Sequence, residues 1–102
     1  KADANYLKAI SLDPRNTDMY VNLYQLYRSP YPKTTTAAED ILKQGIAATG
    51  GVYQLHVELA RYYAGKNRTA EANVAYDAAI AAAKEQNKTE AAAQIEAEKA
   101  AL

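Results

Sequence analysis

The sequence predicts an all-α fold of about six helices, and three observations lead to this prediction. Alanine is the commonest residue, with 23 copies among 102 residues, and all nine aromatic residues are Tyr. An interior of Ala, Leu, Ile and Tyr suits closely packed helices better than a sheet, which favours Val, Ile, Thr and Phe. Apolar residues recur at helical spacing, and Gly, Pro and Asn separate the periodic stretches.

The first two helices are separated by Asp13-Pro14. We predict a helix over 2–12, which ends there because Pro has no amide hydrogen and clashes with the preceding turn. Asn16 is placed to cap a second helix over 17–28. Four apolar residues of this helix share one face at i, i+3, i+4 and i+7: Tyr20, Leu23, Tyr24 and Tyr27.

The longest connection is the stretch SPYPKTTT, which leads into a third helix. Thr36 and Glu39 form a capping-box pattern that starts this helix. Gly50-Gly51 is expected to end it, because glycine adopts the left-handed backbone of a helix C-terminus. Tyr31 lies between the two prolines and is a candidate contact for a partner.

Three further helices follow. We predict one over 52–64, and the next over 69–86 after a turn in which Gly65 and Asn67 tolerate left-handed backbone. The stretch NKTE resembles a capping box and opens a last helix that runs to the end of the chain. The motifs NRT and NKT match the glycosylation acceptor pattern, but at helix boundaries Asn and Thr are expected to cap.

One pattern of small, large and small residues recurs at i, i+4 and i+7 in three of the predicted helices. The triplets are Ala2, Tyr6 and Ala9; Ala38, Leu42 and Gly45; and Ala72, Tyr76 and Ala79. Their offsets are 36 and 34 residues. Residues at this spacing share a helix face, and the small ones let helices approach closely. A near-constant period of this length is typical of stacked helical pairs.

At these residues the sequence resembles the tetratricopeptide repeat family, whose unit is a helix pair of about 34 residues. The stretch LARYYAGKNRTAEANVAYDAAI carries the family's pattern, and the resemblance covers about residues 1–83. It implies a right-handed α-solenoid of antiparallel helix pairs in a single domain. The parts would be the second helix of a truncated repeat (1–14), two repeats (16–50 and 52–84) and a capping helix (87–102).

The resemblance also implies a function, because the first helix of each family repeat lines a concave groove. We therefore expect a protein-interaction scaffold that binds a peptide or protein segment. The residues that map to the groove are Asp18, Val21, Asn22, Gln25 and Arg28 from one helix, and Gln54, Val57, Glu58 and Arg61 from another. Some family members clamp a peptide's terminal carboxylate here, but Asp18 and Glu58 oppose the few cationic candidates, so that activity is not carried over.

Several tyrosines and the single histidine need separate interpretations. Tyr20 and Tyr27 map to core positions of the family, whereas Tyr24 falls where the family prefers Gly or Ala. Tyr24 and Tyr31 are therefore the tyrosines expected to lie outside the core. His56 maps to a position packed between the helices of a pair, so a structural role is favoured over a functional one.

Composition argues against several classes of function. Twelve basic and twelve acidic residues balance, which gives no electrostatic footprint for nucleic acid. No apolar run is long enough to insert in a membrane. A single His and no Cys do not make a transition-metal site, and neither Ser11 nor Ser29 lies in a nucleophile motif. We expect no enzymatic activity, no metal and no cofactor, and both cytoplasmic and extracytoplasmic locations stay open.

Two alternative functions are left open by the sequence. The first is homo-oligomerisation, because a chain that starts inside a repeat would leave the face of Tyr6, Ala9 and Ile10 uncovered. The second is that of an accessory domain in a larger enzyme or a membrane-associated assembly protein.

Overall fold

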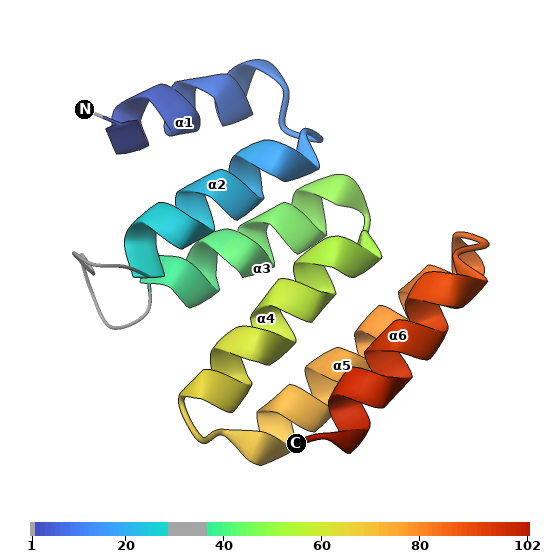
Figure 1. Ribbon diagram of the computed structural model, residues 1–102. Coiled ribbons are helices and arrows are strands. Elements are labelled where there is room, and N and C mark those ends of the chain that lie inside the picture. Colours follow the sequence, from blue (N-terminus) through green and yellow to red (C-terminus); the bar gives the residue numbers. More distant parts are fainter. Residues whose placement is uncertain (1, 29–36) are drawn as a thin grey trace. The chain divides into compact units, whose positions relative to one another are not determined.

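The computed structural model describes residues 2–28 and 37–102, without the side chains of residues 2–4, 27, 28 and 37. This part of the chain contains six α-helices and no strand (Figure 1), so the predicted all-α class is confirmed. The helices are α1 (Ala2–Leu12), α2 (Thr17–Arg28), α3 (Ala37–Thr49), α4 (Tyr53–Gly65), α5 (Thr69–Glu85) and α6 (Thr89–Ala100).

The chain divides into two compact units, Lys1–Gly50 and Gly51–Leu102. Each unit is described by itself. The boundary coincides with the end of the predicted repeat 16–50, while the single domain over 1–102 stays a prediction.

In the first unit, the turn between α1 and α2 forms around Asp13-Pro14 as expected. The amide of Asp13 still donates to the carbonyl of Ala9 (3.0 Å), and the amide of Asn16 donates to the carbonyl of Asp13 (3.1 Å). The hydroxyl of Tyr20 donates to the carbonyl of Pro14 (2.6 Å), which ties α2 to the turn. Burial, assisted by the charge of Asp13, raises the pKa of Tyr20, so this donor keeps its proton.

The core of the first unit lies along α2, which packs against both α1 and α3. Its buried residues include Leu23 and Leu42. Tyr24 is only 1% exposed, so the expectation that it lies outside the core is wrong. The reason is that Tyr24 follows Tyr20 by four residues and shares its buried face. The side chain of Tyr27, and Tyr31 altogether, lie outside the described residues.

The apolar face of α1 that the sequence predicted to be uncovered is in fact covered. Ile10 is 5% exposed, and Tyr6 and Ala9 are half-buried, because this face packs on α2. The expected uncovered face of Tyr6, Ala9 and Ile10 is therefore wrong. The exposed leucines of α1 are instead Leu7 and Leu12, the latter 78% exposed.

The end of α3 agrees with the prediction. The helix ends at Thr49, and Gly50 and Gly51 follow with φ of 78° and 92°. A side chain at either position would be strained, because L-residues with a Cβ rarely adopt this backbone.

The second unit consists of α4, α5 and α6, joined by two short turns of the same construction (Figure 1). Asn67 and Asn87 adopt left-handed backbone, with φ of 61° and 60°. The amide of Arg68 donates to the carbonyl of Tyr63 (2.9 Å), and the amide of Lys88 makes the matching bond in the second turn (2.7 Å). These bonds close the preceding helix as a Schellman motif does.

The prediction that Asn and Thr cap the starts of α5 and α6 is wrong. The N-cap residues are Arg68 and Lys88, and neither makes a side-chain cap hydrogen bond. Asn67 and Asn87 end the preceding helices instead, since Asn tolerates the left-handed conformation better than most residues.

The interior of the second unit centres on α5, which packs against both α4 and α6. Ala72 and Ala79 are fully buried and Tyr76 is nearly so, which agrees with a triplet of small, large and small residues facing other helices. Because Ala72 and Ala79 have only methyl side chains, the neighbouring helices can approach α5 closely.

Ala72 provides a test of this packing. Replacement by Leu should overpack the contact and lower the free energy of unfolding by about 1–3 kcal/mol, measured by urea denaturation followed by circular dichroism. Ala81→Leu is the matched control, because Ala81 lies exposed on the same helix and its replacement should change stability little. Equal stability of the two variants would contradict the close contact.

Candidate functional site: a groove between α4 and α6

Four of the residues predicted to bind a peptide lie together in the second unit. Gln54, Val57, Glu58 and Arg61 occur at i, i+3, i+4 and i+7 of α4 and therefore share one face. They line a groove of about 240 Å³ whose other wall is α6. The complete lining of this α4–α6 groove is Tyr53, Gln54, Val57, Glu58, Arg61, Ala91, Gln94, Ile95 and Glu98.

A network of polar side chains bridges the two walls. The guanidinium of Arg61 makes a bidentate pair with the carboxylate of Glu98, with Nε–Oε2 and Nη2–Oε1 distances of 2.8 and 2.9 Å. Nη1 of Arg61 lies 3.3 Å from Oε2 of Glu58 on the same helix. The hydroxyl of Tyr76, from α5, donates to Oε2 of Glu98 (2.7 Å). One carboxylate thus joins all three helices of the unit.

These contacts shift the pKa values of the groups that make them. The bond from Arg61 lowers the pKa of Glu98, against a smaller opposing effect of burial. The bond to Glu98 raises the pKa of Arg61. Burial, with the bond to Glu98, raises the pKa of Tyr76 to about 12. At neutral pH the pair is therefore fully ionised and the phenol is a proton donor.

The floor and rim of the groove differ in chemistry. Val57 and Ile95 are buried and make the floor apolar, whereas Gln54 and Gln94 are exposed at the rim. An apolar side chain can pack on this floor, while the two amides can donate to and accept from a peptide backbone. The arrangement is suited to holding a short segment of chain and offers no nucleophile beside a general base.

The remaining predicted groove residues belong to the first unit. On α2, Asp18 and Gln25 are exposed, and Val21 and Asn22 are half-buried. The side chain of Arg28 lies outside the described residues. A groove that includes α2 stays a prediction.

Sequence reasoning missed the residues of α6. Its Lys and Glu residues suggest a solvated face, yet Glu98 is engaged in the groove, and its side chain is only 33% exposed. No pattern in the sequence singles out Glu98, because it is one of several acidic residues on a polar helix and its partner lies on another helix.

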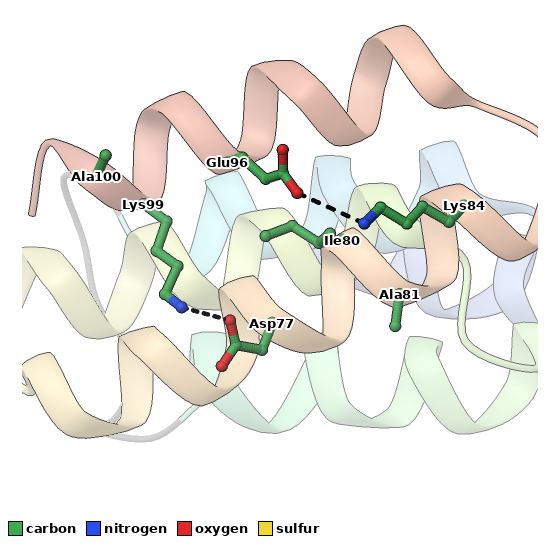
Figure 2. Close-up of a pocket in the computed structure, with 7 residues that line it drawn as sticks. All are labelled: Asp77, Ile80, Ala81, Lys84, Glu96, Lys99 and Ala100. Carbon is green, nitrogen blue, oxygen red and sulfur yellow. Dashed lines mark hydrogen bonds and ion pairs between the residues drawn. The ribbon is translucent and has the colours of Figure 1, made fainter.

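A second surface lies on α5 and α6 and is lined by Asp77, Ile80, Ala81, Lys84, Glu96, Lys99 and Ala100 (Figure 2). Nζ of Lys99 lies 2.6 Å from Oδ1 of Asp77, and Nζ of Lys84 lies 3.6 Å from Oε2 of Glu96. Both pairs cross from one helix to the other. Such exposed pairs contribute little to stability, but they make this face of α6 charged.

Other candidate chemistries find little support among the described residues. His56 is half-buried, and burial lowers its pKa, which favours its neutral form. In the described ranges, no cluster of three or more His, Cys, Asp or Glu side chains could hold a metal ion. The helices described are all too short or too polar to cross a membrane.

Comparisons of the chain with protein-family models, with curated proteins and with solved structures found no match. The tetratricopeptide resemblance therefore rests on the residues quoted above.

The bridge between Arg61 and Glu98 can be measured with a double-mutant cycle. Alanine at each position alone and at both should give a coupling free energy of about 0.5–1 kcal/mol, because the geometry is bidentate but Arg61 is 52% exposed and screened by solvent. Urea denaturation supplies the stabilities. The Lys84–Glu96 pair is the matched control and should show a coupling near zero. A coupling no larger for Arg61–Glu98 would contradict the bridge.

Proposed function

We propose that this chain is a protein-interaction module and that it binds a peptide segment in the α4–α6 groove. One observation carries the proposal. The α4 residues that the family resemblance assigns to peptide binding line a single groove with an apolar floor and an amide rim. In this function the chain's own residues supply positioning and complementarity.

The proposal includes a tetratricopeptide-like solenoid as the architecture. In it, α2 with α3 and α4 with α5 are two repeats, α1 is the second helix of a further repeat, and α6 is a capping helix. The short turns of the second unit and the buried triplet of α5 support this assignment. The charged outer face of α6 also fits, because the last helix of a solenoid needs a polar surface toward solvent.

The binding mode follows from the groove's dimensions and chemistry. A volume of about 240 Å³ accommodates one or two side chains, with the rest of a segment running along the rim. An apolar side chain would cover Val57 and Ile95 and thereby exclude water from the floor. The glutamine amides would fix the register of the bound backbone.

Selection from a random peptide library displayed on phage tests this function. Peptides should be enriched on the wild-type chain, and Gln54→Trp should weaken their binding about tenfold, because the indole fills the groove. Affinities are measured by fluorescence anisotropy with synthetic peptides.

The matched control is Ala93→Trp, which adds the same indole at an exposed position of α6 that is not part of the groove lining. Its affinity should equal that of the wild type. Enriched peptides that bind Gln54→Trp as well as the wild type would contradict binding in the groove.

Self-association is the second candidate function, and exposed Leu7 and Leu12 on α1 favour it. Light scattering across a concentration series would then give a mass above the 11.1 kDa of one chain. Leu12→Lys should restore the mass of a monomer, since it replaces the more exposed of the two leucines with a charge. A monomer at every concentration in the wild type would rule out this function.

A further inference from the structure

The α4–α6 groove has an uneven charge. Two carboxylates, from Glu58 and Glu98, and one guanidinium, from Arg61, line it, so it carries one net negative charge at neutral pH. The guanidinium is engaged by both carboxylates. A ligand in the groove therefore meets acceptors that are negatively charged and a cation that is already paired.

Resting on the function proposed above, we propose that the groove selects peptide segments with a cationic side chain over segments with an anionic one. Glu98 is the selecting residue. It occupies the bidentate face of Arg61, where a ligand carboxylate would otherwise bind.

An anionic segment would have to displace Glu98 before it could reach Arg61. Displacement breaks the two charged hydrogen bonds to Arg61 and the bond from Tyr76. It leaves the carboxylate of Glu98, whose side chain is 33% exposed, without its cation, and this loss disfavours the anionic segment. An anionic segment that leaves Glu98 in place meets the repulsion of Glu58 and Glu98 instead.

A cationic segment requires no rearrangement. An ionised carboxylate can accept about four hydrogen bonds, so Glu58 and Glu98 can each accept a further bond while they hold Arg61. Lysine or arginine on the ligand would balance the groove's net charge. The carboxylates of Glu58 and Glu98 attract a cationic segment and repel an anionic one. Charged sites commonly discriminate between partners in this way.

Glu98→Gln separates this selecting role from the structural one. The amide oxygen of Gln can still accept from Tyr76, and the side chain keeps its size, but the negative charge is lost and Arg61 is less neutralised. Glu96→Gln is the matched control. It makes the same charge change two residues away, on the face of α6 that bears the Lys84 pair (Figure 2).

The experiment selects peptides from the same displayed library on the wild type, Glu98→Gln and Glu96→Gln, after circular dichroism shows that all three fold. Wild type and Glu96→Gln should enrich net cationic peptides, and Glu98→Gln should shift enrichment toward acidic ones. One enriched peptide is then synthesised with its Lys or Arg replaced by Glu. The wild type should bind the replaced peptide about tenfold more weakly, and Glu98→Gln should reduce this difference to about twofold.

The outcomes separate the two proposals. Enriched peptides that are neutral or acidic, but lose binding to Gln54→Trp, keep the groove as the site and overturn its charge selection. A wild-type preference that survives Glu98→Gln unchanged also overturns the role of Glu98. No enrichment above background overturns peptide binding itself, and the charge selection with it.

Discussion

The bidentate pair of Arg61 and Glu98 is the interaction on which the second unit's arrangement depends. The helix α6 buries only Ala92 and Ile95, so it contributes little apolar surface to the core. Glu98 supplies what the apolar contact lacks, because it links α6 to α4 through Arg61 and to α5 through Tyr76. The pair thereby joins the two walls of the groove.

The same pair has a second consequence, which concerns recognition. A cation in a groove ordinarily attracts a carboxylate, and Arg61 is the guanidinium that lines the α4–α6 groove. Glu98 already engages that cation, so in the proposed binding mode one contact would contribute to both stability and selectivity. A groove that captured acidic segments through Arg61 would have to give up the bond between Arg61 and Glu98.

Much of the fold was predictable, because the signals were local. Pro14 marks the end of α1, Gly50 and Gly51 follow α3, and the triplet of α5 is buried as its spacing indicated. Each of these depends on a few neighbouring residues and on the geometry of one helix. The burial of Tyr24 was missed because the family pattern has a small residue at that position, although the spacing from Tyr20 placed both tyrosines on one apolar face.

The candidate site was predictable only on one wall. The face of α4 follows from helical spacing, whereas Glu98 lies 37 residues beyond Arg61 in the chain. A long-range pair of this kind has no periodic signature, and an acidic residue on a polar helix gives no sign of which cation it meets. The carboxylate that Glu98 contributes to the groove could therefore be identified only from the structure, in which α6 packs on α5.

The most direct test of the account is a map of amide chemical-shift changes in the ¹⁵N-labelled chain during titration with a cationic peptide. We expect the changes to gather at Gln54, Val57, Gln94 and Ile95, with the Nε–H resonance of Arg61 still protected by Glu98 at saturation. Changes that gather at Asp77, Lys84 and Lys99, or along α1, would contradict it and place the binding surface elsewhere.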